Sequence, residues 1–179
     1  LMRGKNTTNW TLHYSRGIAY EQLGDWMSAE KDFRRALEIK PDQPYVLNYL
    51  GYSLVEKRLK LEEALSLIEK AVSLRPESGY IVDSFGWVLF RLSRFVEAVP
   101  HLEKAAKLMP VDPIVNDHLG DVYWAVGRKR EARFQWNRAL SFDPKDADQA
   151  RIVKKLKMGL DQVLIEEGSN PLEFSKSDD

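Results

Sequence analysis

Apolar residues recur every three or four positions along most of the chain, which is the period of α-helices that bury one face. The stretch 64–72 is typical, with Ala64, Leu65, Leu67, Ile68, Ala71 and Val72 at this spacing. The first two helices are expected at roughly 10–23 and 26–39. At about 1.5 Å of rise per residue, each is about 20 Å long. The pattern therefore predicts short consecutive helices.

A period of 34 or 35 residues organises these helices. It is kept by prolines at 41, 76, 110 and 144, by glycines at 17, 51, 86 and 120, and by alanines at 29, 64, 98 and 132 and at 36, 71, 105 and 139. A fixed period of this size indicates stacked supersecondary units. One interval is longer by a residue between Gly51 and Ala64, and we assign the insertion to the turn 58–60, since turns tolerate added residues.

The repeated block resembles the tetratricopeptide repeat (TPR). The first copy carries Gly17, Tyr20, Gly24, Ala29, Phe33, Ala36 and Pro41, and later copies place Ile68, Leu102 and Trp136 in the Phe33 column. Small residues suit the close crossing of two helices, and proline ends the second helix because it lacks an amide donor. The resemblance implies an all-α fold: a right-handed TPR solenoid of four helix-turn-helix repeats plus a C-terminal capping helix, nine helices in total.

The predicted boundaries follow the repeat. Residues 1–9 form the start of a fragment, for which further repeats are expected upstream, and the four repeats span 10–43, 44–78, 79–112 and 113–146. A capping helix is expected over 147–167, with an apolar face of Ala150, Val153, Leu156, Leu160, Val163 and Leu164. Its basic residues Arg151, Lys154, Lys155 and Lys157 are interpreted as a solvated face rather than a nucleic-acid patch. Residues 168–179 are expected to form a disordered tail.

Composition narrows the function classes. Of 179 residues, 44% are hydrophobic, and 27 Lys and Arg balance 27 Asp and Glu, so no global field favours nucleic acid or an anionic membrane. The absence of cysteine excludes disulfides, thiolate metal sites and a cysteine nucleophile. No apolar run reaches the roughly 20 residues of a membrane helix. No P-loop, dinucleotide fingerprint, nucleophile elbow or zinc-protease motif occurs. We therefore expect no catalysis, no cofactor and no membrane contact by this chain.

In TPR proteins the first helix of each repeat lines a concave groove, and the resemblance implies which positions do so here. The groove includes Tyr45, Tyr80 and Ile114, and the candidate partner-binding residues are Asn48, Tyr52, Asp83, Trp87, Phe90, Arg91, Asp117, Asp121 and Trp124. We propose one ridge of anchors, because other residues of each repeat already fill the positions that pack its two helices together. The anchors are Tyr52, Trp87, Phe90 and Trp124. The alternative that some of them pack on the next helix stays open.

Charge and residue type limit the partner. Acidic residues outnumber Arg91 along the predicted groove, which favours a neutral, apolar or basic segment. A clamp for acidic chaperone tails is disfavoured, because only Asn48 matches that clamp in type. The similar pentatricopeptide array, which binds RNA, is disfavoured by the acidic groove. Asp117, His118 and Asp121 have a spacing that can seat a metal ion, but a polar groove wall is the favoured interpretation and no metal is expected.

A more specific resemblance is to the C-terminal TPR arrays of larger Gram-negative proteins, on blocks such as 41–52 and 116–121. Some of those relatives are exported or lipid-anchored adaptors, including ones that bring substrates to a periplasmic protease, which favours the bacterial periplasm over the cytoplasm. We expect a non-catalytic adaptor that binds an extended peptide or a partner helix. The alternative is the substrate-recognition arm of a larger enzyme or protease complex. The partner's identity and the oligomeric state stay open.

Overall fold

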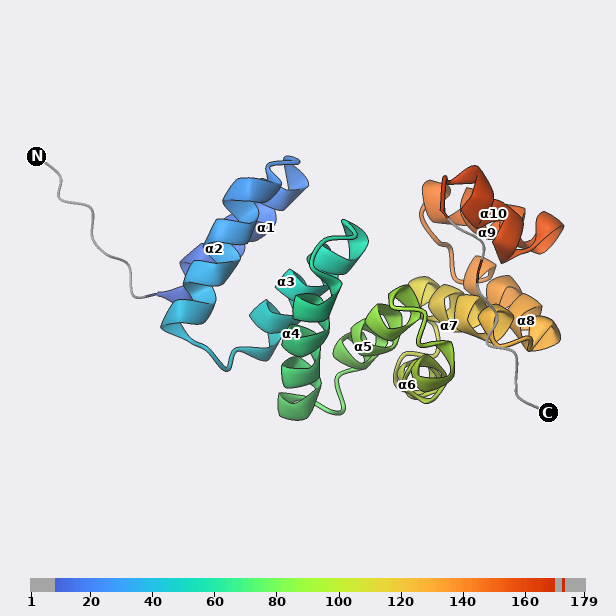
Figure 1. Cartoon of the computed structure of the whole chain (residues 1–179), viewed down its shortest axis with the longest axis horizontal. Coiled ribbons are helices and arrows are strands. Elements are labelled where there is room, and N and C mark those ends of the chain that lie inside the picture. Colours follow the sequence, from blue (N-terminus) through green and yellow to red (C-terminus); the bar gives the residue numbers. More distant parts are fainter. Residues whose placement is uncertain (1–8, 170–171, 173–179) are drawn as a thin grey trace, which may run out of the picture. The chain divides into compact units, whose positions relative to one another are not determined.

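The computed structural model describes residues 9–169 and 172, and this part contains ten helices and no β-strand (Figure 1). The helices are α1 (Trp10–Gln22), α2 (Trp26–Ile39), α3 (Pro44–Glu56), α4 (Leu61–Leu74), α5 (Gly79–Arg91), α6 (Phe95–Leu108), α7 (Pro113–Ala125), α8 (Lys129–Leu140), α9 (Asp146–Met158) and α10 (Leu160–Glu166). They form two compact units, Leu1–Pro76 and Glu77–Asp179. The predicted all-α TPR class is confirmed.

The N-terminal unit consists of two helical hairpins, α1 with α2 and α3 with α4, and α2 packs against α3. Local signals define the helix starts, since the side chains of Asn9 and Asp25 accept hydrogen bonds from backbone amides in the first turns of α1 and α2. An aromatic cluster fills the interior. Phe33 lies 5.1 Å from the ring of Tyr49 and 6.2 Å from that of Tyr14.

The C-terminal unit repeats this arrangement with α5 and α6, then α7 and α8, and adds α9 and α10. Helix α6 packs on α7. A small cluster there takes one residue from each of α5, α6 and α7: Val82, Ala105 and Val115. Helix α7 begins at Pro113, and Asp112 accepts hydrogen bonds from the amides of Ile114 and Val115 at 2.9 and 3.0 Å. These contacts fix where α7 begins, and hence which side chains it presents.

The periodic small residues lie where the two helices of each repeat cross. All eight periodic alanines are fully buried. A Cβ added at each periodic glycine would lie 2.4 to 2.6 Å from the large residue of the second helix: Gly17 from Phe33, Gly51 from Ile68, Gly86 from Leu102 and Gly120 from Trp136. The repeat signature is therefore a packing requirement.

Replacing Gly120 with alanine is expected to destabilise the C-terminal unit by about 1 to 3 kcal/mol, because an added methyl in a filled core forces neighbouring side chains to move. The Trp136 ring that it meets is fully buried and has little room to shift. Urea denaturation followed by tryptophan fluorescence measures the change. Gly127→Ala is not a clean control, since that glycine has a φ of 83°. Gln149→Ala, at an exposed position of α9, is the better one, and an equal loss there would contradict the crossing argument.

The insertion appears where the sequence places it. The turn between α3 and α4 spans 57–60, whereas the equivalent turns span 23–25, 92–94 and 126–128. Arg58 and Lys60 take left-handed backbone conformations there, with φ of 55° and 46°. The prediction of a longer turn is confirmed.

The cap differs from its prediction in two ways. It is two helices rather than one, because Gly159, with φ of 86°, breaks the chain between α9 and α10. In α9 the buried residues are Ile152 and Lys155, and the predicted Ala150 is exposed, whereas Leu160 and Val163 of α10 are buried as predicted. The predicted fragment start and disordered tail lie outside the described residues, except Asn9, Gly168, Ser169 and Leu172.

Candidate interaction site

The predicted partner-binding residues fall on three inner helices. Helix α3 of the N-terminal unit carries Asn48 and Tyr52, α5 carries Asp83, Trp87, Phe90 and Arg91, and α7 carries Asp117, Asp121 and Trp124. Asn48 and Tyr52 are half-buried, and the buried Asn48 Oδ1 has no hydrogen-bond partner among the described residues. Tyr52 lies in the N-terminal unit and Trp124 in the C-terminal unit. The single ridge that joins them therefore stays a prediction.

Trp87 lies in the middle of a stack within the C-terminal unit. Its ring is 4.8 Å from that of Phe90 and 3.9 Å from that of His118, and both pairs are nearly parallel. The Arg91 guanidinium lies over the same indole, 5.9 Å from its centre. Trp87 and Phe90 are 7% and 6% exposed, so they present little surface to a ligand.

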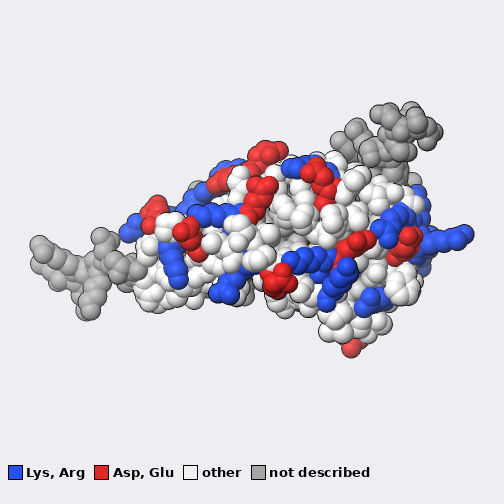
Figure 2. Space-filling model, turned by 90° about the horizontal axis from the view of Figure 1, so that it is seen from below, with Lys and Arg blue, Asp and Glu red and all other residues white. Residues whose placement is uncertain are grey.

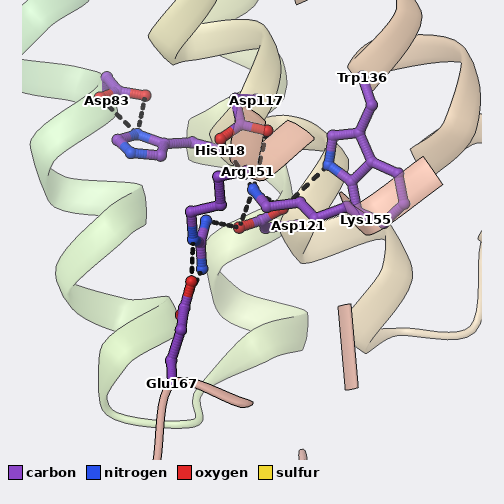
Figure 3. A network of polar contacts seen from close by, with 8 residues as sticks. All are labelled: Asp83, Asp117, His118, Asp121, Trp136, Arg151, Lys155 and Glu167. Atoms are coloured by element: carbon purple, nitrogen blue, oxygen red, sulfur yellow. Dashed lines mark hydrogen bonds and ion pairs between the residues drawn. The ribbon is translucent and has the colours of Figure 1, made fainter. Parts of the chain in front are cut away.

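Asp83 and His118 form a buried pair between α5 and α7. The His118 Nδ1 lies 3.1 and 3.0 Å from the two carboxylate oxygens of Asp83 (Figure 3). Burial alone lowers the pKa of His118, but the charge and hydrogen bond of Asp83, with smaller contributions from Asp117 and Asp121, outweigh it and raise the pKa above its ordinary value. The pair therefore favours the imidazolium.

Lys155 of α9 neutralises the two carboxylates of α7. Its Nζ donates to both oxygens of Asp117 at 2.8 Å and to those of Asp121 at 2.7 and 2.8 Å, and its side chain is fully buried (Figure 3). Burial raises the pKa of Asp117; the Lys155 charge opposes that rise and the Asp121 charge adds to it. The interpretation of Lys155 as part of a solvated face is wrong.

Further donors complete this cluster. The indole nitrogen of Trp136 donates to Asp121 at 2.9 Å, and Arg151 lies 3.5 Å from the same carboxylate while also pairing with Glu167 at 2.7 Å. A second contact lies further along α7, where the Trp124 indole donates to Asp161 of α10 at 2.8 Å. Gly159 approaches that ring so closely that a Cβ would lie 2.5 Å away.

Helices α9 and α10 therefore cover the side of α7 that was predicted to line an open groove. Trp124 is 7% exposed and Asp121 is fully buried. Trp87, Phe90 and Trp124 are all buried, which corresponds to the alternative that they pack on neighbouring helices. Any partner contact by these residues stays a prediction. The metal-type spacing of Asp117, His118 and Asp121 serves ion pairs instead, since each side chain has an internal partner.

Two residues of the same inner helices remain open to solvent. Tyr80 and Ile114 are each the second residue of their helix, α5 and α7, and are 66% and 43% exposed. At spacings of three and seven residues, Tyr80 shares a helix face with Asp83 and Trp87. Ile114 occupies the same position one repeat later. The inner face of this unit thus has an exposed apolar edge beside a buried polar layer.

The Asp83–His118 pair makes stability depend on pH. Because the native pKa of His118 is raised above its ordinary value of 6.5, the stabilisation is fully present below that value and is lost as the pH rises through the native pKa. The C-terminal unit should be more stable to urea at about pH 6 than at about pH 9. His118→Gln should flatten this dependence, whereas a variant that keeps the full slope would assign it to other groups.

The fold and this inner face define a class: helical-repeat proteins whose packed hairpins leave a surface for other proteins. TPR family models match residues 10–43 and 84–147. The chain belongs to the tetratricopeptide repeat family. It is 37% identical over 87 residues to a TPR repeat-containing protein of Pseudomonas aeruginosa, and the match covers 49% of this chain but 15% of that protein. The chain thus spans a small part of that curated relative's length.

Solved structures share the fold. PilF of Pseudomonas aeruginosa aligns with a TM-score of 0.69 and 18% identity over 90% of this chain and 76% of its own. MamA of AMB-1 aligns with a TM-score of 0.65 and 26% identity, covering 77% and 81%. YrrB, described as a TPR protein with an unusual peptide-binding site, gives 0.64 and 23% identity over 89% and 84%.

The family sets the general function. TPR proteins bind protein partners and are generally non-catalytic scaffolds, and the chain shares both their repeat models and their fold. None of the helices in the described part of the chain is long and apolar enough to cross a membrane.

Proposed function

We propose that the chain is a non-catalytic adaptor that binds an extended peptide or a partner helix along the inner helices of its C-terminal unit. The observation that carries the proposal is the exposure of Tyr80 and Ile114, 66% and 43%, at the same position of α5 and α7. Neither side chain is needed to fill the unit's interior. Large apolar residues at an exposed edge are the kind of contact that dominates peptide recognition.

The buried layer beside this edge supports the proposal by holding it rigid. Asp83, Asp117 and Asp121 all form internal ion pairs, and Trp87 is stacked against Phe90 and His118. A rigid surface loses little entropy when a partner binds. Because the carboxylates are already neutralised, we propose that apolar side chains of the partner, rather than basic ones, supply most of the affinity.

The same surface could serve as the recognition arm of a larger enzyme or protease complex, as the resemblance suggests. The match covers 15% of the Pseudomonas relative, so this alternative rests on the resemblance alone. A periplasmic location also stays a prediction.

Substitution of the exposed edge tests the proposal. Peptides selected on the immobilised chain from a display library should bind at least about tenfold more weakly to Tyr80→Ala or Ile114→Ser, as expected when one anchor worth about 1 to 3 kcal/mol is lost. Val96→Ser, an equally exposed apolar position on α6, is the matched control. Helicity should be unchanged. If none of the selected peptides distinguishes the edge variants from the control, the proposed edge is not the binding surface.

A further inference from the structure

The outer face of α8 combines an exposed aromatic residue with clustered arginines. Phe134 is 61% exposed, and Arg130 and Arg133, four residues and one residue before it, are exposed as well. Lys157 of α9 lies next to Leu156, whose carbonyl accepts a hydrogen bond from Arg133 at 2.7 Å. We call Arg130, Arg133, Phe134 and Lys157 the α8 patch.

The repeat architecture does not account for Phe134. In the period of the array, Phe134 occupies the column of Lys31, Ser66 and Pro100, and all three are exposed. This column points to solvent in every repeat, so an aromatic residue gains nothing there from packing within the repeat. Exposing a phenylalanine leaves its apolar area in water, which costs free energy unless a partner covers it.

The charges of the patch form no internal ion pairs within the described part of the chain, although Arg133 donates to the Leu156 carbonyl and lies 5.9 Å from the centre of the Trp124 ring. Neither Arg130, Arg133 nor Lys157 forms an ion pair with any residue that the structure describes, although many other surface cations of the chain do. The one acid of α8, Glu131, pairs with Arg128. Like charges three or four residues apart on one helix repel each other, as Arg130 and Arg133 do. An acidic ligand would relieve this repulsion.

This local excess stands out because the chain is neutral overall. Lys and Arg equal Asp and Glu at 27 each, and on the face shown in Figure 2 basic and acidic side chains are mixed. A short patch of three cations and one exposed aromatic residue matches a protein segment better than a long uniform polyanion, which needs an extended basic surface. Arginine and aromatic residues are also the types enriched at protein-binding hot spots.

We propose that the α8 patch is a second docking surface, which binds an acidic segment of a partner protein that carries one large apolar side chain. Aspartates or glutamates of that segment pair with Arg130, Arg133 and Lys157, and its apolar residue covers Phe134. This surface is separate from the edge with Tyr80 and Ile114, so one chain can hold two segments at once.

Display selection on the whole chain, with counter-selection on the double variant Arg130→Glu, Phe134→Ser, tests the proposal. The enriched peptides should combine acidic residues with one large apolar residue. A labelled synthetic copy should bind the single variants Phe134→Ser and Arg130→Glu at least about tenfold more weakly than it binds the parent chain. For Arg130→Glu, the loss of affinity should be larger at low salt. Val111→Ser and Lys107→Glu are matched controls, since both positions are exposed and lie outside the patch. The double variant Tyr80→Ala, Ile114→Ser should bind the peptide as the parent does.

Four results would overturn the proposal. The selected peptides could be neutral or basic, their affinity could be the same for the patch variants and the controls, or replacing the peptide's apolar residue by serine could leave its affinity unchanged. A fourth is nucleic acid: a single-stranded DNA oligonucleotide that binds as tightly as the peptide, with the same dependence on Arg130, would assign the patch to nucleic acid. Circular dichroism confirms that each variant is folded, which is expected because every substituted position is exposed.

Discussion

Replacing Lys155 with methionine is expected to lower the free energy of unfolding of the C-terminal unit by about 3 to 5 kcal/mol, because removal of one partner leaves buried charges uncompensated. Asp117 and Asp121 both depend on this cation, which donates to each of their oxygens within 2.8 Å. Methionine keeps much of the side-chain volume, so the change isolates the charge. Urea denaturation followed by fluorescence measures the loss.

Two further variants show whether the charge is responsible. Lys154→Met removes the neighbouring lysine, which is exposed and paired with Glu166 at the surface, and should cost less than about 1 kcal/mol. Adding Asp117→Asn and Asp121→Asn to Lys155→Met should recover a large part of the stability, since neither of the carboxylates that Lys155 neutralises then remains. Equal losses for the two lysine variants would contradict the cluster described here.

Ending the chain after Ala150 is expected to remove the cover of the fourth repeat and cause aggregation. The truncation deletes the fully buried residues Ile152, Lys155 and Leu160, and it uncovers Trp124 and Trp136. An array without its terminal cover is poorly soluble. A fall in melting temperature of roughly 10 °C or more is expected, because each kcal/mol lost corresponds to about 4 to 8 °C in a unit of this size.

Ending the chain after Ser169 is the matched control for this truncation. It removes residues 170–179 and keeps every contact of the cap described above. The melting temperature and the monomer peak in size-exclusion chromatography should match those of the parent chain. If the truncation after Ala150 behaved as this control does, α9 and α10 would be dispensable for the fold.

The repeat was predictable from sequence because its signature is local. Gly120 and Trp136 form a contact within one hairpin, and the same contact recurs in all four repeats, so the period exposes it. The extra turn residue between Gly51 and Ala64 was predictable for the same reason. Such contacts join residues less than one period apart, and every copy repeats them.

The polar layer was not predictable, because it joins helices through residues that occur once. Lys155 was counted with the solvated face since lysine is rarely buried, and this shifted the predicted face of the cap away from Ile152. A signal was present: α7 carries Asp117 and Asp121 on one face, and buried carboxylates require a cation from the next helix. The spacing of Ile152 and Lys155 places that cation on the apolar side of α9.

The burial of the aromatic residues has a similar origin. Trp87 is predicted as an anchor because its own repeat needs no residue there, but His118 of the following repeat stacks on it. Tyr80, one residue into its helix, lies beyond the reach of this packing and stays exposed. The surface left for a partner is thus decided by contacts between repeats, and these lie outside the repeat signature.

Isoleucine methyl spectra recorded during titration with an edge-selected peptide test the central claim, that a partner binds the exposed edge of the inner helices. The chain has one isoleucine on this edge, Ile114, while Ile81 and Ile152 are buried in the same unit and Ile165 is exposed on the cap. The largest shift is predicted at Ile114, with small shifts at Ile81 and Ile152. A largest shift at Ile165, with Ile114 unchanged, would contradict the account.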